Sequence, residues 1–268
     1  MNRLYILVVV MAAFLISCDK DDPIENGNDT KEPTGKIQIH FIHNVDGDPL
    51  VTHSMQYTNA AGNEYEIDEV QWFISDVFLH REDGTFYRIE GWKDIHYVDI
   101  DIPSTLKWQV FDDIPAGDYS GISFTFGLNE AQNESFKFVN PPESFMFWPT
   151  VLGGGYHYLK LNGKWKDTVG ATRFFNFHLG IGQEITATDT TYIHNHFEVD
   201  FDTSNFTLQE GEKKDVYITM NIENWFKNPH IYDHNVWGGD IMENQAAMAV
   251  ASENGHDVFS LSFGCCDE

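Results

Sequence analysis

The stretch YSGISFTFGL, residues 119–128, places a large apolar side chain at every second position. A period of two is that of a β-strand with one buried face. The side chains that share this face are Ile122, Phe124, Phe126 and Leu128. RFFNFHLG (173–180) and DVYITMNI (215–222) repeat the pattern. Further strands are expected at residues 36–43, 67–80, 85–99, 156–165, 192–201 and 258–263.

Turn-forming residues separate these strands, as in NAAGNE (59–64), EDGT (82–85) and IPAGDY (114–119). Many short strands divided by such turns are typical of a sandwich. One stretch, GDIMENQAAMAVASENG, instead predicts a helix, with Asp240 as N-cap and Gly255 at its C-terminal end. The expected fold class is therefore all-β: a two-sheet antiparallel β-sandwich with one C-terminal helix.

The first 18 residues, MNRLYILVVVMAAFLISC, predict a secretory signal. Their apolar run is shorter than the roughly 20 residues that a transmembrane helix needs. The last four residues, Leu-Ile-Ser-Cys, are similar to a bacterial lipobox, so we expect Cys18 to be lipidated and to anchor the chain to a membrane. A cleaved signal with an incidental cysteine is the alternative. Residues 19–35 are polar and acidic and predict a tether, and residues 36–268 then form the sandwich domain.

The net charge of −26 argues against nucleic acid as a partner, because nucleic-acid binding needs basic patches. Such a charge suits cations, or solubility outside the cell. Cys265 and Cys266 are adjacent, so a disulfide between them would be strained, and they form either a functional thiol pair or part of a loose tail.

Enzyme signatures are missing from the sequence. It contains no Gly-x-Ser-x-Gly, no His-Glu-x-x-His and no Walker loop. Carboxylate pairs such as Asp99/Asp101 could serve acid–base chemistry on sugars. Such pairs are expected by coincidence among 42 acidic residues, so we do not expect an enzyme.

Twelve histidines are many for 268 residues, and neutral imidazole is a preferred ligand of copper and zinc. In YIHNHFE, residues 192–198, strand alternation places His194, His196 and Glu198 on one face, where two imidazoles could share an ion. A solvated polar face is the alternative.

His157, in GYHYLKLNG, shares its strand face with Leu159, so we expect it to point inward. His43 likewise follows the apolar face of the first strand. An unsatisfied buried polar group costs about 1–3 kcal/mol, so a core histidine bonded to a backbone carbonyl is the alternative to a metal ligand in both cases. His178 lies opposite the apolar stripe of its strand, and the pattern does not assign His96 to a face.

Seven short motifs follow one another over about residues 36–182. They are IHFIHNVDGDPL, Ser-Asp-Val, Pro-Ala-Gly-x-Tyr, Phe-x-x-Gly, Met-Phe-Trp, Gly-Tyr-x-x-x-Lys-Leu-x-Gly and His-Leu-Gly. In this order they resemble the motifs of the MbnP-like copper-binding proteins. These are periplasmic or outer-membrane proteins, and in Bacteroidetes they are often lipoproteins.

The resemblance implies a β-sandwich that binds one copper ion through histidines. In some members an oxidised tryptophan lies at or near the site, and a di-haem oxidase partner carries out that oxidation. Trp148 matches the first tryptophan of the family's Met-x-Trp-x-Trp, and His178 matches its His-Leu-Gly. This chain departs from the pattern at Thr150, in place of the second tryptophan, and at His157, where the family commonly has Lys or Ile. Residues 183–268 are expected to be a branch-specific extension.

We therefore predict a lipid-anchored, extracytoplasmic, non-catalytic protein of the outer membrane, periplasmic or surface-exposed, which binds copper for acquisition or storage beside Trp148. The expected ligands are, in order of preference, His157 and His178, then His43 and His96, with His194 and His196 as a separate site. The alternative function is a surface binding module for glycan or protein, which would use the exposed aromatic residues of a chain that is 15% Phe, Trp and Tyr.

Overall fold

The computed structural model of the chain describes residues 32–201 and 203–264. The expected signal sequence, Cys18, all but the last residues of the tether, and the Cys265–Cys266 pair lie outside these residues. Within the described part of the chain, no helix is both long enough and apolar enough to cross a membrane.

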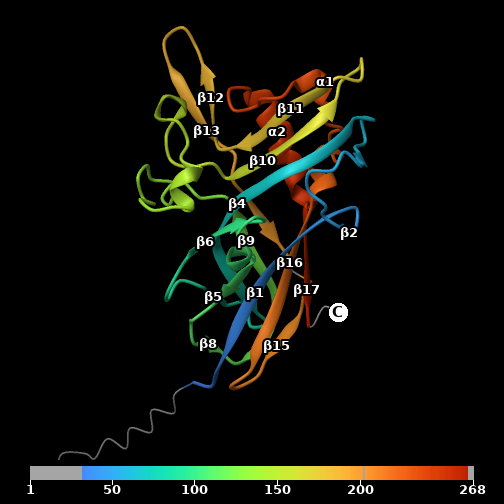
Figure 1. Ribbon diagram of the computed structural model, residues 1–268. Coiled ribbons are helices and arrows are strands. Elements are labelled where there is room, and N and C mark those ends of the chain that lie inside the picture. The colour runs from blue at the N-terminus through green and yellow to red at the C-terminus, as the bar shows by residue number, and fades with distance from the viewer. Residues whose placement is uncertain (1–31, 202, 265–268) are drawn as a thin grey trace, which may run out of the picture. The chain divides into compact units, whose positions relative to one another are not determined.

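Six strands form the first sheet, in the order β17–β16–β1–β2, with β7 and β8 also paired to β1 (Figure 1). β1 and β16 run parallel, and the other pairs in this sheet are antiparallel. Parallel neighbours need a long connection, which the other sheet supplies here. The bounds are β1 Thr34–Val45, β2 Asp48–Pro49, β7 Lys107–Gln109, β8 Ile114–Pro115, β16 Lys213–Asn221 and β17 Phe259–Phe263.

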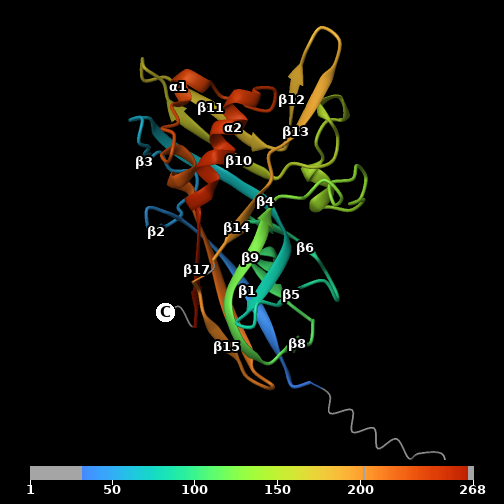
Figure 2. The same cartoon turned by 180° about the vertical axis from the view of Figure 1, so that it is seen from behind.

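Nine strands form the second sheet, in the order β11–β10–β4–β9–β14, with β3, β5 and β6 on β4 and β15 on β9. All of its strand pairs are antiparallel. The bounds are β3 Tyr57–Thr58, β4 Glu64–Arg81, β5 Phe86–Arg88, β6 Ile95–Asp99, β9 Gly117–Phe126, β10 Leu159–Lys166, β11 Thr172–Leu179, β14 Phe197–Asp200 and β15 Phe206–Leu208. A separate hairpin of β12 (Ile181–Ile185) and β13 (Thr190–His194) projects beyond β10 and β11 (Figures 1 and 2).

The expected all-β sandwich with a C-terminal helix is confirmed. The two sheets meet around Trp72 of β4, which has no exposed surface. Its ring lies 5.5 Å from Phe41 of β1, 6.0 Å from Phe126 of β9 and 5.2 Å from Phe259 of β17. Each such pair stabilises the fold by about 0.5–1.5 kcal/mol beyond the burial of its two rings. The cluster therefore helps to hold together strands that are distant in sequence.

Two expected strands are each divided in two. The expected strand at 85–99 is interrupted because the amides of Glu90 and Gly91 donate to the Asp112 carboxylate, at 3.0 and 2.8 Å, instead of to a neighbouring strand. The expected strand at 192–201 breaks at Asn195, whose side chain is buried and donates to the carbonyl of Gly180 at 2.9 Å.

The C-terminal helix α2, Gln245–Asn254, begins later than expected. Its N-cap is Asn244, whose side chain accepts a hydrogen bond from the amide of Ala247, whereas the expected cap, Asp240, pairs with Asn176 of β11. Figure 2 shows α2 and the short helix α1 over one face of β10 and β11. The remaining helical bounds are α1 His234–Trp237, η1 Pro103–Leu106, η2 Glu143–Met146, η3 Thr150–Leu152, η4 Ile222–Phe226 and η5 Gly255–Asp257.

Candidate metal centre

Two of the expected ligands, His157 and His178, lie together at the start of β10 and the end of β11. Their ring centroids are 4.9 Å apart and their planes stand at 85°. His178 is opposite Lys160 in the β10–β11 ladder and lies on the polar face of β11, as expected. His157 precedes the first residue of β10, so strand alternation does not determine its direction. It is nevertheless buried, as expected, and its ring packs against those of His178 and Trp148.

Each imidazole uses one nitrogen for a structural hydrogen bond. Nδ1 of His157 donates to the carbonyl of Met146 at 2.8 Å. Nε2 of His178 donates to the amide oxygen of Asn162 at 2.7 Å, and Asn162 in turn donates to Glu69. These bonds fix the tautomers, since a carbonyl oxygen only accepts. Nε2 of His157 and Nδ1 of His178 therefore keep a lone pair.

In this histidine pair, Nδ1 of His178 is the ring atom that is best suited to bind a metal. It is buried and has no hydrogen-bond partner. Burial lowers the pKa of His157 to about 3, with a further contribution from His178, and burial likewise lowers the pKa of His178 to about 3. Both rings are thus neutral at physiological pH, which is the form that binds metals. Metal-binding histidines usually donate their other N–H to an oxygen, and both of these rings do so.

Trp148 forms the wall beside His157. Its side chain has no exposed surface, and its ring lies 4.7 Å from that of His157, at 74°. The indole N–H donates to the carbonyl of Leu152 at 3.1 Å, which fixes the ring. Gly180 packs against it so closely that an added Cβ would lie 2.6 Å from the indole. The glycine of the His-Leu-Gly motif is therefore required by Trp148.

His43 and His96 lie elsewhere, between the sheets. Nε2 of His43 accepts a hydrogen bond from Trp72 Nε1 at 3.1 Å, so its lone pair is already used. His96 is stacked between Phe41 and Trp108, at 5.2 and 5.1 Å, and its Nε2 donates to the carbonyl of Thr105. Both histidines have a packing role in this structure.

His194 and His196 are close to each other but do not lie on one strand. Their rings are 6.0 Å apart, and Nε2 of His194 is 3.6 Å from a carboxylate oxygen of Glu130. The expected common face with Glu198 is wrong, because the chain leaves the hairpin at Asn195 and Glu198 belongs to β14. Within residues 32–201 and 203–264, no three or more His, Cys, Asp or Glu side chains converge as a metal site.

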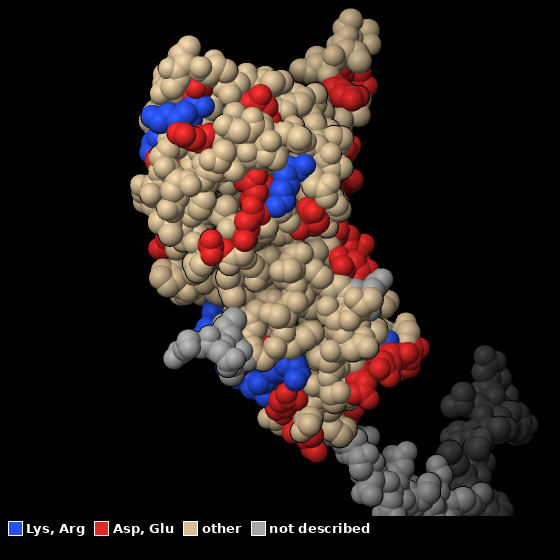
Figure 3. Space-filling model, turned by 90° about the vertical axis from the view of Figure 1, so that its right-hand side faces the viewer, with Lys and Arg blue, Asp and Glu red and all other residues tan. Residues whose placement is uncertain are grey.

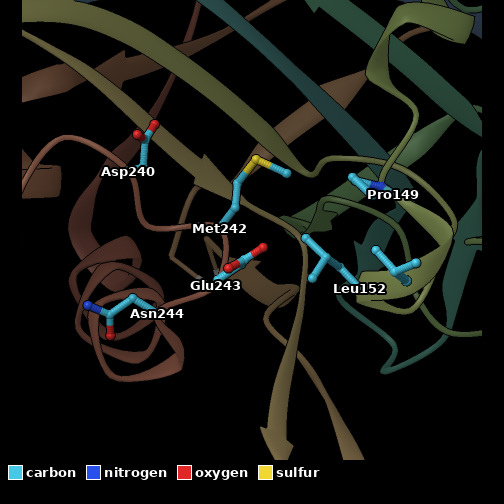
Figure 4. Close-up of a pocket in the computed structure, with 7 residues that line it drawn as sticks. Pro149, Leu152, Asp240, Met242, Glu243 and Asn244 are labelled. Carbon is cyan, nitrogen blue, oxygen red and sulfur yellow. The ribbon is translucent and has the colours of Figure 1, made fainter.

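A cavity of about 660 Å³ adjoins Trp148 through the turn that follows it (Figure 4). Pro149, Val151, Leu152 and Met242 form apolar walls, and Asp240, Glu243 and Asn244 add polar groups. The sequence motifs did not indicate this cavity, because its two sides are about 90 residues apart in the chain. Acidic side chains are spread widely over the face of the molecule in Figure 3, in keeping with the net charge of −26.

Comparison with known proteins is consistent with this architecture. The MbnP family model matches residues 34–243. This chain belongs to the MbnP family. The match includes part of the segment 183–268 that we expected to be an extension, and it stops before α2. The structure is similar to that of MbnP from Methylosinus trichosporium, with a TM-score of 0.54 and 14% identity over 86% of this chain and 99% of that chain. At that identity the likeness shows a shared fold. Among curated proteins, none matches the sequence.

Proposed function

We propose that this MbnP-family protein binds copper outside the cytoplasm, without catalysing a reaction, for copper acquisition or storage. The observation that supports the proposal most strongly is the buried, unpartnered Nδ1 of His178 beside the free Nε2 of His157. Two neutral imidazoles and few oxygen ligands suit a copper ion better than Ca²⁺ or Mg²⁺, which take oxygen ligands. Trp148, which has no exposed surface, covers one side of His157.

The experiment is copper loading of the protein without its first 18 residues, followed by dialysis and elemental analysis. We expect one copper ion per chain in the wild type and a large loss in His157→Ala and His178→Ala. The control is His256→Ala, because His256 is exposed and bonds only the carbonyl of Glu253. The proposal would be contradicted by a wild-type copper content no higher than background. It would also be contradicted by an unchanged copper content in a variant that carries both His157→Ala and His178→Ala.

We also propose that Cys18 carries the lipid anchor and that the protein faces the periplasm or the cell surface. The lipobox-like residues 15–18 support this location. Radiolabelled fatty acid should enter the wild type but not Cys18→Ser. Protease treatment of intact cells then separates the two orientations, because only a surface-exposed domain is cleaved.

By family resemblance alone, we propose a di-haem oxidase as a partner that acts on Trp148. The position of Trp148 against His157 supports a modified residue at the copper site. Mass spectrometry of the Trp148 peptide from the native host should show added oxygen. An unmodified peptide from cells that contain the oxidase would contradict this part of the proposal.

A second candidate function is a surface binding module for glycan or protein. Trp92 and Phe111 are 75% and 59% exposed, and their rings form an edge-to-face pair 5.8 Å apart. Exposed aromatic pairs of this kind bind sugar or protein surfaces. A glycan-array signal that persists after chelation and disappears in Trp92→Ala would support this function over copper binding.

A further inference from the structure

We infer that the ammonium group of Lys160 makes the histidine pair selective for ion charge, so that the site favours Cu(I) over divalent ions. The inference rests on the proposed copper site. Lys160 is the lysine of the Gly-Tyr-x-x-x-Lys-Leu-x-Gly motif, and it would act through its charge and not as a ligand.

Strand pairing places Lys160 beside His178. The two residues are directly opposite each other in the antiparallel β10–β11 ladder. Residues paired in this way share a face of the sheet, and their Cβ atoms are about 4.5–5.5 Å apart. On its other side, Lys160 is opposite Gln71 of β4. Lys160 therefore lies on the face of His178, with a neighbouring strand on either side.

The short helix η2 connects Lys160 to His157. Nζ of Lys160 donates to the carbonyl of Phe145 at 2.5 Å. The next carbonyl in the chain, that of Met146, accepts from Nδ1 of His157 at 2.8 Å. Two consecutive carbonyls thus hold the ammonium group and the imidazole. Lys160 is thereby fixed near both histidines, by the ladder on one side and by η2 on the other.

The charge of Lys160 acts on both rings. Burial is the main cause of the low pKa of His178, and the charge of Lys160 lowers this pKa further. For His157, burial and His178 are the larger causes, and Lys160 again lowers the pKa. A positive charge that disfavours a proton on an imidazole also disfavours a metal cation there. The cost is proportional to the charge of the ion, so it is twice as large for a divalent ion as for Cu(I).

The carboxylates nearest to Lys160 are held by other groups. Gln71 donates to Glu69 at 2.6 Å and to Asp99 at 3.3 Å, and Asn162 also donates to Glu69. Burial lowers the pKa of Lys160, while Glu69 and Asp99 act in the opposite direction and support its charged form. Within the described residues, no third His, Cys, Asp or Glu converges with the histidine pair. An ion there meets two neutral ligands and a fixed positive charge, which suits a monovalent ion best.

The test measures the affinities for Cu(I), Cu(II) and Zn(II) by competition with chromophoric chelators. Lys160→Gln loses the charge and keeps a donor for the carbonyl of Phe145. We expect it to bind Cu(I) about tenfold more tightly and the divalent ions about a hundredfold more tightly, because the repulsion doubles with the charge of the ion. The reduction potential of the bound copper should fall by about 59 mV, which corresponds to a tenfold change in the ratio of the two copper affinities.

Lys160→Arg keeps the charge and should bind the three ions as the wild type does. The matched control is Lys164→Gln, on the same face of β10, because Lys164 is paired with Glu66 and Asp68. It should change none of the affinities. Equal factors for all three ions in Lys160→Gln would show that Lys160 only holds Phe145, and would overturn the inference while the proposed function stands. An equal gain for divalent ions in Lys164→Gln would do the same. If the wild type binds no copper, the proposed function fails as well.

Discussion

At the scale of single residues, buried histidines divide into two kinds in this protein. His43, His96 and His157 each have a hydrogen bond that occupies a ring nitrogen. His234 differs, because it has no exposed surface and neither of its ring nitrogens has a partner. Its ring stacks on Phe175 at 4.5 Å and on Trp165 at 5.4 Å. The imidazole of His234 therefore packs as the ring of a phenylalanine would at this position.

His234→Phe should therefore raise the free energy of unfolding by about 1 kcal/mol. The substitution removes a buried N–H that lacks an acceptor and keeps the aromatic stacking. Urea denaturation at pH 7 measures the change. His256→Phe is the control, because His256 is exposed and the same substitution there should have almost no effect. Destabilisation by His234→Phe would show that the imidazole has a partner, such as an ordered water.

Stability should fall as pH decreases from about 6.5 towards 3. Burial lowers the pKa of His43 to about 4 and that of His234 to about 3, while the unfolded histidines titrate near 6.5. Between these values the unfolded chain binds more protons than the folded chain, so acid favours unfolding. Urea midpoints at pH 7, 5.5 and 4.5 test this. The decline should be shallower in His234→Phe, and an equal decline would contradict the assignment to His234.

At the scale of elements, the junction between β11 and β12 controls the wall of the site. Gly180 lies between the two strands and its Cα faces the indole of Trp148. Asn195, at the junction between β13 and β14, donates to the carbonyl of Gly180 and holds the same junction from the other side. The short segment around Gly180 therefore positions both the β12–β13 hairpin and the histidine pair.

Gly180→Ala should lower the free energy of unfolding by about 1–3 kcal/mol, because the new methyl group overpacks a rigid, buried ring. It should also reduce copper occupancy by displacing Trp148 from His157. Urea denaturation and elemental analysis measure the two effects. Adding Trp148→Phe to the variant makes room and should restore part of the lost stability, in a double-mutant cycle. Simple additivity of the two changes would contradict direct packing.

At the scale of the whole molecule, copper should stabilise the folded protein. The two imidazoles come from β11 and from the chain before β10, so the site exists only when the sheet is formed. Free Cu(I) at about 100 times the dissociation constant should add about 2.7 kcal/mol to the free energy of unfolding. Thermal denaturation with and without copper measures the shift. His178→Ala should show almost none, and an equal shift in that variant would place copper elsewhere.

The strand pattern of the sequence determined most of the fold. The alternation in residues 119–128, 173–180 and 215–222 predicted β9, β11 and β16. A half-buried strand alternates apolar and polar side chains, and this pattern can be read from the residues of the strand alone. His178 and Trp148 could be proposed as site residues from motifs for the same reason, since each motif is a short, continuous stretch. The N-cap of α2 was placed wrongly because Asp240 forms its hydrogen bond with β11, a partner that no local pattern reveals.

Only the tertiary structure decided which histidines meet. His157 and His178 are 21 residues apart and are joined by the β10–β11 ladder, while His43 and His96 are occupied by Trp72 and Thr105. Periodicity reports the face of a strand on which a side chain lies, but convergence depends on strand order and register. These are properties of long-range pairing, and they bring His157 and His178 together.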